Sequence, residues 1–266
     1  MKPFCVFVAV IALMVGSGAP VGAEEESFSL RLMAYNIHHG AGVDKKLDLG
    51  RIGELIAGES PDLVALQEVD SVCKRSKSLD QAAELGQLTG MHHAFGKFMD
   101  FQGGEYGLAV LSRFPILETI RHQLPEGAEP RCALEVQVGV PGMETPVSFV
   151  SIHHDWTDPE FRLAQVKTLL EALKDRHHPV ILAGDFNGER TDASMQLLAD
   201  EGWTIVEKNA GTGSKTFPSR EPRVEIDFFV IRGFSEAKMD HTVMEEEVAS
   251  DHRPIRAVIE FGGSAP

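Results

Sequence analysis

The sequence predicts a single domain of mixed α/β class, and three observations support this prediction. Short apolar segments typical of buried strands alternate with segments of helical period. Several strand segments follow one another in a way that favours antiparallel pairing. No stretch rich in Gly, Ser and Pro is long enough to separate two domains, and a chain of 266 residues can bury a substantial core.

The individual elements follow from the spacing of apolar residues. Strands are predicted at residues 28–37, 62–66, 106–111, 131–138, 147–152, 180–183, 226–230 and 255–261. Helices are predicted near residues 49–56, 80–88, 159–173 and 193–199. The apolar stripe of the third helix is expected to contain Phe161, Val166, Leu169, Leu170 and Leu173.

The N-terminal segment, residues 1–23, has the layout of a secretory signal peptide. Lys2 supplies a positive charge, residues 5–15 form a short apolar core, and residues 21–23 offer small side chains before a cleavage site. The apolar core is shorter than the ~20 residues that span a bilayer, so we prefer cleavage to a membrane anchor. We therefore expect residues 24–266 to form the mature domain, which is secreted or periplasmic.

Composition narrows the possible partners. The formal net charge is −15 and the pI is about 5.1. An acidic chain without a basic stripe or interleaved aromatic residues argues against a processive nuclease. Two Trp, two Tyr and no evident apolar hairpin argue against insertion into a lipid surface. Two cysteines beyond the signal peptide, Cys73 and Cys132, could form one disulfide, and the sequence leaves their pairing open.

Polar residues recur where the apolar strands end, and rigid strand ends are places where folds present chemical groups. These residues are Asn36, Glu68, His153, Asp185, Asn187, Asp227, Asp251 and His252. Each one alone has an ordinary interpretation, as a solvated carboxylate or a structural histidine, so the prediction depends on the ordered set. The sequence contains no zinc-binding spacing and no P-loop. Oxygen ligands such as these suit a hard divalent cation.

The most informative segment follows the strand at residues 180–183. Gly184 allows the chain to turn sharply, and Asp185 and Asn187 lie two positions apart. On an extended backbone their side chains would point the same way. A carboxylate beside an amide can position a nucleophile and hold a charged oxygen. The alternative is a simple turn, because Gly, Asp and Asn are common turn residues.

Seven ordered segments carry a resemblance to a known family. They are AYNIH (34–38), LQEV (66–69), YGLAVLS (106–112), SIH (151–153), GDFN (184–187), EIDF (225–228) and SDHRP (250–254). The chain resembles the endonuclease/exonuclease/phosphatase superfamily, which includes DNase I, exonuclease III-type nucleases, secreted sphingomyelinases and inositol polyphosphate 5-phosphatases. The resemblance covers about residues 29–261. It implies a four-layer α/β sandwich, with two central mixed β-sheets flanked by helices and the site at one edge.

The resemblance also implies a metal site and a general base. Glu68 resembles the main metal-binding carboxylate, with Asn36 beside it and Asp251 as a further metal-site carboxylate. Mg²⁺ is the expected ion, and Mn²⁺ is a possible substitute. His252 resembles the base that takes a proton from the attacking water, oriented by Asp227, because a carboxylate fixes the tautomer and stabilises the imidazolium.

Further residues are implied to contact the phosphate. Asp185 and Asn187 resemble groups that orient the nucleophile and bind a non-bridging oxygen. His153 resembles a donor to the phosphate as its charge builds in the transition state, although His154 follows it directly. Tyr106 abuts its motif strand and resembles a phosphate contact.

Three arginines lie next to these motifs. Arg75 and Arg131 could clamp a phosphate bidentately, although a surface salt bridge is the more ordinary interpretation. Arg162 and Gln165 lie one helical turn apart, and we expect them to brace the loop after His153.

The leading prediction is therefore an exported, Mg²⁺-dependent hydrolase that cleaves a phosphodiester or phosphomonoester by in-line attack of water. Small molecules or lipid headgroups are the favoured substrates, and nucleic acid is possible. The alternatives are a secreted DNase I-like nuclease and a sphingomyelinase-like phospholipid phosphodiesterase. Neither stable membrane insertion nor a protein partner is implied. A binding module that had lost its chemistry would lack at least one motif residue, and none is missing.

Overall fold

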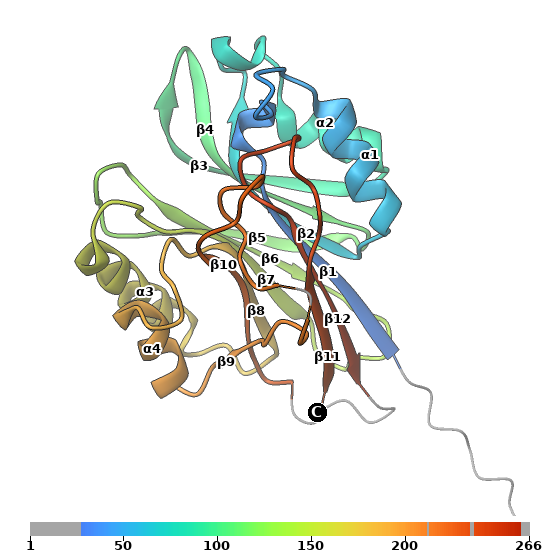
Figure 1. Ribbon diagram of the computed structural model, residues 1–266. Helices are drawn as coiled ribbons and strands as arrows, with labels where there is room; N and C mark the ends of the chain where they lie inside the picture. The colour runs from blue at the N-terminus through green and yellow to red at the C-terminus, as the bar shows by residue number, and fades with distance from the viewer. Residues whose placement is uncertain (1–27, 212, 235–236, 262–266) are drawn as a thin grey trace, which may run out of the picture.

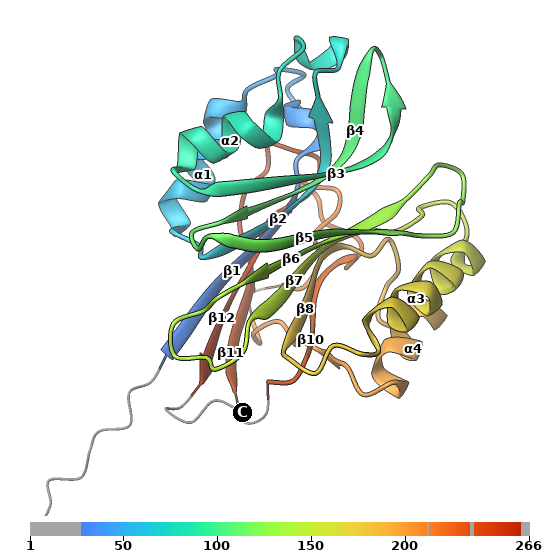
Figure 2. The same ribbon diagram turned by 180° about the vertical axis from the view of Figure 1, so that it is seen from behind.

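The computed structural model describes residues 28–211, 213–234 and 237–261, in which two mixed β-sheets are stacked face to face (Figures 1 and 2). The predicted signal peptide lies outside these residues. None of the helices in the described ranges is long and apolar enough to cross a bilayer.

Each sheet has six strands within the described residues. The first has the order β11 (Lys238–Val243), β12 (Ile255–Phe261), β1 (Phe28–Asn36), β2 (Leu63–Ser71), β4 (Gly104–Ser112) and β3 (His92–Phe101). The second has the order β5 (Ile116–Gln123), β6 (Cys132–Val138), β7 (Val147–His153), β8 (Val180–Asp185), β10 (Asp227–Arg232) and β9 (Thr204–Ile205). The pairs β1–β2 and β7–β8 are parallel, and the other pairs are antiparallel.

Helices cover the outer face of each sheet, which completes four layers (Figure 1). Helices α1 (Leu49–Glu59) and α2 (Gln81–Thr89) pack on the first sheet, and α3 (Pro159–Leu173) and α4 (Ala193–Asp200) pack on the second. Strand β1 shows how one strand serves two layers: Leu32 and Ala34 face the core between the sheets, whereas Met33 and Tyr35 face α1 and α2. The predicted four-layer sandwich is confirmed.

The helix starts follow from capping residues in the sequence. Each of the four α-helices is preceded by an aspartate whose carboxylate accepts a backbone N–H of the first turn. These caps are Asp48, Asp80, Asp158 and Asp192. Helix α2 ends at Gly90, whose φ of 68° is the left-handed conformation that favours glycine.

Some elements differ from the expectations. Strands β3, β5, β9 and β11 were not predicted, nor were two short 3₁₀ helices, η1 (His38–Gly40) and η2 (Lys74–Ser76). Phe161 does not lie in the apolar stripe of α3, because its side chain is exposed. The buried face of α3 is Arg162, Gln165, Val166, Leu169 and Leu173, which recur at helical spacing.

Both cysteines of the described residues are buried free thiols. The Cys73 thiol donates to backbone oxygens of Phe101 and Glu105 at 3.1 and 3.2 Å. Burial raises the pKa of Cys73 to about 11 and that of Cys132 to about 12, so both are unreactive thiols rather than nucleophiles.

Candidate active site

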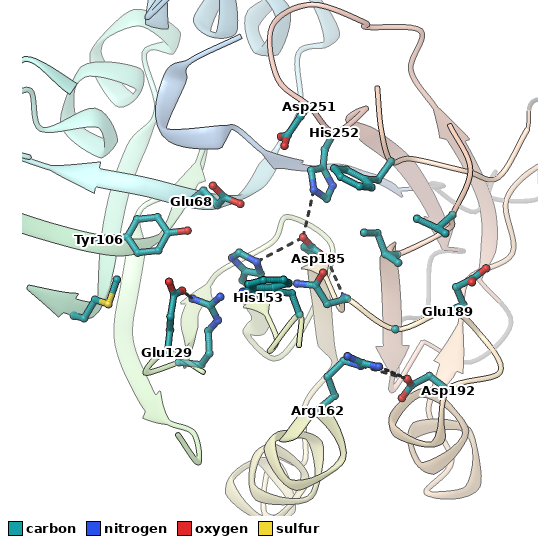
Figure 3. Close-up of a pocket in the computed structure, with 18 of the residues that line it drawn as sticks. Glu68, Tyr106, Glu129, His153, Arg162, Asp185, Glu189, Asp192, Asp251 and His252 are labelled. Carbon is teal, nitrogen blue, oxygen red and sulfur yellow. Dashed lines mark hydrogen bonds and ion pairs between the residues drawn. The ribbon is translucent and has the colours of Figure 1, made fainter. Parts of the chain in front are cut away.

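A cleft of about 780 Å³ opens at one edge of the two sheets, where strands of both sheets end. Its lining includes nine of the predicted site residues, several of which are labelled in Figure 3. They are Glu68, Arg75, Tyr106, Arg131, His153, Asp185, Asn187, Asp251 and His252 as lining groups, with Asp227 hydrogen-bonded directly behind them. Asn36, at the end of β1, hydrogen-bonds to two of the lining carboxylates. The site residues predicted from the sequence therefore lie together at one edge of the sheets.

Glu68 reaches the cleft through an irregularity in β2. The register between β2 and β4 shifts between Leu66 and Val69, and Glu68 has a φ of 58° in this bulge. A bulge turns one side chain out of the normal alternation, and a non-glycine residue at such a φ is strained. The Asn36 amide nitrogen donates to Glu68 at 3.1 Å and to Asp185 at 3.1 Å, so Asn36 ties together carboxylates from the two sheets.

Glu68 and Asp251 are carboxylates without a basic partner. Glu68 accepts its hydrogen bond from Asn36, and Asp251 accepts a contact of 3.3 Å from the Ser250 hydroxyl. Neither forms an ion pair with a cationic side chain in the part of the chain that the structure describes. Both face the same part of the cleft (Figure 3). Carboxylate oxygens that have no cationic partner suit a hard divalent cation.

Two groups of possible metal ligands have donor atoms within 4.8 Å of one another in the described residues. The first group is His38, His39 and Glu68, and the second is Asp185, Asp227 and His252. His38 and His39, which the motif analysis did not single out as ligands, both have left-handed φ values, 45° and 46°. Each group is a possible metal site, and the first contains Glu68, one of the predicted metal-binding carboxylates.

The segment after β8 turns instead of continuing as an extended strand. Asn187 has a φ of 51°, and its backbone N–H donates to the Asp185 carboxylate at 2.9 Å. The expectation that both side chains point the same way on an extended backbone is therefore wrong, because Asp185 closes a local turn with its own side chain. The turn still brings both residues to the cleft. The Asn187 amide donates to the backbone oxygen of His154 at 3.0 Å.

His252 lies between two buried carboxylates. Its Nδ1 is 3.0 Å from Asp227 Oδ2. Its Nε2 is 3.6 Å from Asp185 Oδ2 (Figure 3). Burial lowers the pKa of the ring, but Asp227 and Asp185 outweigh this effect and raise the pKa to about 10. Burial also raises the pKa of Asp185, to about 7. This arrangement stabilises an imidazolium and fixes which nitrogen faces the cleft.

Of the adjacent histidines, His153 faces the cleft. Its Nε2 lies 3.6 Å from Asp185 Oδ2, and burial together with Arg131 lowers its pKa well below the usual value. The ring is therefore neutral at neutral pH. His154 is fully buried and packs edge-on against Phe186 with ring centroids 5.4 Å apart. The choice between the two histidines made from the sequence agrees with this placement.

Tyr106 and Arg75 form one wall of the cleft. Arg75 donates from Nε and Nη2 to Asp70 at 2.8 and 2.7 Å, and its guanidinium lies 4.5 Å from the ring centroid of Phe101. Tyr106 is buried and packs edge-on against Phe98. Arg75 is thus held in a bidentate ion pair with a buried aspartate, which is not the surface salt bridge of the alternative interpretation, and it also lines the cleft.

Arg131 is not a surface residue. Only 1 % of its surface is exposed, and its guanidinium lies 4.9 Å from the ring centroid of Phe98. Its Nη1 lies 3.0 Å from Glu129 Oε2, and Glu129 also lines the cleft (Figure 3).

Arg162 and Gln165 brace the loop after His153. Gln165 accepts the N–H of Asp155 at 2.9 Å and donates to the oxygen of Pro125 at 3.1 Å. Arg162 pairs with Asp192 at 2.7 Å, so helices α3 and α4 are also joined here. These contacts are the bracing role expected from the spacing of the two residues.

Glu129, Trp156 and Phe217 are among the lining residues that sequence reasoning missed. The Phe217 ring packs against His252 with centroids 4.8 Å apart, and Trp156 is 64 % exposed at the rim. Phe217 lies in the irregular segment at residues 213–223, where no apolar period marks it. Proximity to motif residues was the available signal for Trp156, which follows His153 by three positions.

Two stacked mixed sheets, with carboxylates and histidines converging at one edge, define the scaffold of a phosphoester hydrolase. The sequence matches the Endonuclease/Exonuclease/phosphatase family over residues 33–252, and the chain belongs to this family. The activities in that name all cleave phosphate ester bonds, so the enzyme class and the family predicted from the motifs are confirmed.

Individual proteins are similar to this chain over most of its length. The uncharacterized protein YbhP of Escherichia coli (strain K12) is 26 % identical over 249 residues, which cover 89 % of this chain and 98 % of YbhP. A solved endonuclease/exonuclease/phosphatase from Beutenbergia cavernae has a TM-score of 0.75 at 24 % identity, with 90 % of this chain and 72 % of that chain covered. The mannosyl-6-phosphatase Bt3783 of Bacteroides thetaiotaomicron has a TM-score of 0.70 at 17 % identity, with 87 % and 100 % covered. These structures share the fold.

Proposed function

We propose that the chain is an exported, Mg²⁺-dependent phosphoesterase that uses water as its nucleophile. The observation that carries this proposal is the position of Asp185, which contacts Asn36, His153 and His252 at the centre of the cleft. Beside it, Glu68 and Asp251 lack cationic partners in the described residues. Hydrolysis of a phosphate ester needs positive charge on the phosphoryl oxygens and a base for the attacking water, and this cleft offers residues for both.

Each residue has a role in this proposal. His252 accepts the proton of the attacking water, and Asp227 holds the ring at Nδ1. His252 must enter the reaction unprotonated, and a cation held at Glu68 and Asp251 would lower the pKa of its ring. His153 donates to a phosphoryl oxygen as a neutral imidazole.

Asn187 and Tyr106 contact the phosphate in this proposal, and Asn36 positions Glu68. Glu68 and Asp251 would hold the divalent cation, with His38 and His39 close to Glu68. When bound, the cation would supply Lewis-acid stabilisation of a phosphoryl oxygen.

A small, soluble phosphate ester is the preferred substrate. The net charge of −15 opposes non-specific attraction to nucleic acid or anionic lipid. The name of the Bacteroides structure, a mannosyl-6-phosphatase, supports the idea that this fold can serve a small-molecule monoester. A secreted nuclease and a phospholipid phosphodiesterase remain the competing proposals, since their substrates carry the same phosphoester group.

A substrate panel tests the proposal. Purified protein would be assayed in Mg²⁺ and in EDTA against DNA, RNA, sphingomyelin, inositol phosphates, sugar phosphates and p-nitrophenyl esters. We expect cleavage of small esters that EDTA abolishes and that His252→Ala lowers by about 100-fold or more. Nucleic acid cleavage that vanishes in His252→Ala would instead establish the nuclease. For export, N-terminal sequencing of protein recovered from outside the cytoplasm should begin at Glu24, and a start at Met1 would contradict cleavage.

A further inference from the structure

Among the described residues, three arginines line the cleft, and Arg131 differs from the other two in its unused donors. Arg75 is occupied by Asp70, and Arg162 is occupied by Asp192. The Nε and Nη1 atoms of Arg131 are buried and have no hydrogen-bond partner in the described residues. A buried guanidinium carries a cost unless acceptors satisfy its donors. The side chain therefore suits an acceptor that arrives with a ligand.

The position of Arg131 is fixed by aromatic packing beside the predicted phosphate contacts. Its guanidinium lies 4.9 Å from the centroid of Phe98. The Phe98 ring in turn lies 6.1 Å from the ring of His153 and 5.8 Å from that of Tyr106. Arg131 thus shares one aromatic neighbour with His153 and Tyr106, two of the residues proposed to contact the phosphate.

The anion already next to Arg131 can be displaced. Glu129 Oε2 lies 3.0 Å from Arg131 Nη1, but the geometry is that of an ion pair and not of a hydrogen bond. The Glu129 side chain is 38 % exposed, whereas that of Arg131 is 2 % exposed. An incoming anion can therefore replace the partly exposed Glu129 carboxylate at the buried guanidinium of Arg131.

The number of non-bridging oxygens on the phosphate ester decides which substrates can use the Arg131 guanidinium. A phosphate diester has two non-bridging oxygens and one negative charge. A phosphate monoester has three non-bridging oxygens and a charge of about −1.5 to −2 near neutral pH. The contacts already proposed for the phosphate are the cation, His153, Asn187 and Tyr106. The third oxygen, which only the monoester has, would find the free donors of Arg131.

We infer that the cleft is built for phosphate monoesters and that Arg131 donates to the third non-bridging oxygen. This inference rests on the proposed function and names its substrate class. In the reaction, the water oxygen bonds to phosphorus and the bond from phosphorus to the ester oxygen breaks. One proton of the water passes to His252, the ester oxygen takes a proton from solvent water, and His252 returns its proton to solvent. The products are an alcohol and inorganic phosphate.

The kinetic test compares two substrates in the full chain with Mg²⁺. We measure kcat/KM for p-nitrophenyl phosphate and for bis-p-nitrophenyl phosphate. Arg131→Gln should lower the monoester value by about 30-fold or more, the size expected for a charged hydrogen bond, and the diester value far less. The control Arg256→Gln removes an exposed arginine that pairs with Glu59, away from the cleft, and should change neither value. Equal losses on both substrates, or a wild-type preference for the diester, would overturn the inference.

Phosphate binding separates this inference from the proposed function. Calorimetry with inorganic phosphate and Mg²⁺ needs no turnover. Arg131→Gln should weaken binding, and Glu129→Gln should tighten it by roughly 3- to 10-fold because a competing anion is removed. A wild type that binds phosphate through Arg131 without hydrolysing any ester would refute the proposed function and keep the anion site. Unchanged phosphate binding in both variants would refute the inference. If Arg131→Gln does not fold, the phosphate affinity of Glu129→Gln is the deciding measurement.

Discussion

At the scale of single residues, the site depends on backbone conformations that few side chains tolerate. Gly184 has a φ of 133°, and a Cβ there would lie 2.4 Å from both the Ile152 oxygen and the Gln67 amide nitrogen. Gln67 is buried and donates to Ser151 at 3.1 Å, which joins the two sheets behind the cleft. Gly184 therefore allows β8 to approach the other sheet at the point where it delivers Asp185.

We expect Gly184→Ala to destabilise the protein by about 3 kcal/mol, the combined cost of a strained φ and a close backbone contact. Urea unfolding monitored by circular dichroism measures this change. Gly58→Ala is the matched control, because a Cβ at Gly58 in α1 meets nothing within 4 Å. It should be neutral or stabilise the protein by up to ~1 kcal/mol, as Ala does in place of Gly in a helix. Equal effects of the two substitutions would refute the role of Gly184.

Residue types and order were enough to predict the polar set, but not how each residue is held. The segment GDFN predicts a turn or a site, and only the structure shows that Asp185 caps Asn187 in a left-handed conformation. The burial of Arg131 was also hidden, because a charged residue after a Pro-containing loop is usually exposed. Its pocket is made by Phe98 in β3, a strand distant in sequence.

At the scale of elements, the buried carboxylate of Glu135 links three strands of the second sheet to the segment that follows α3. Glu135 in β6 accepts hydrogen bonds from Ser148 in β7 at 2.5 Å and from Arg176 at 3.0 Å, and it contacts His122 in β5 at 2.6 Å. Burial raises the pKa of Glu135, but the hydrogen bonds from His122, Arg176 and Ser148 outweigh it and lower the pKa to about 2. The ionised carboxylate therefore joins three segments.

This carboxylate should make stability depend on pH. Its folded pKa lies below the ordinary value of 4.5, so its stabilisation is full above about pH 5 and is lost as the pH falls towards 2. Glu135→Gln should lower the free energy of unfolding at pH 7 by roughly 3 kcal/mol at most. Urea titrations at pH 7 and at about pH 3 should show the difference between the variant and wild type shrinking in acid. A difference that stays constant over this range would contradict the role of the charge.

Elements with strong periodicity were predictable, and edge elements were not. Helix α3 was predicted with its observed bounds, because an Asp-Pro start and a long amphipathic period mark it. Strand β5 was missed because it lies at a sheet edge and alternates between exposed and half-buried residues, without an apolar run. Strand β11 is likewise an edge strand, with only His241 fully buried. Edge strands need little apolar sequence, so periodicity does not reveal them.

At the scale of the whole molecule, the cleft exists because two sheets end at a common edge. Asn36 and Glu68 come from the first sheet, and His153, Asp185 and Asp227 come from the second. The pairing of these sheets was implied by the family resemblance and not by residue patterns, because strand order depends on contacts between distant segments. The hydrogen bond from Asn36 to Asp185 crosses the two sheets, so the site and the packing of the layers are linked.

The net charge of the molecule gives a prediction for its proposed metal. A formal charge of −15 creates a negative potential that attracts cations, and this attraction is screened over about 10 Å at 0.1 M salt and about 3 Å at 1 M. If Mg²⁺ binds at Glu68 and Asp251, it should raise the melting temperature of the folded protein by mass action. The Mg²⁺ concentration that gives half of this rise should increase several-fold between about 0.05 M and about 0.5 M NaCl.

Thermal unfolding across a Mg²⁺ series at each salt concentration measures this midpoint. Glu68→Gln should remove most of the rise in melting temperature, because it takes away a charged oxygen ligand while keeping the shape of the side chain. A midpoint that does not move with salt would mean that the local ligands alone set the affinity and that the global charge has no part in it. If Mg²⁺ still raises the melting temperature of Glu68→Gln, the ion does not bind at this carboxylate. The second group of donors, around Asp185 and Asp227, would then be its site.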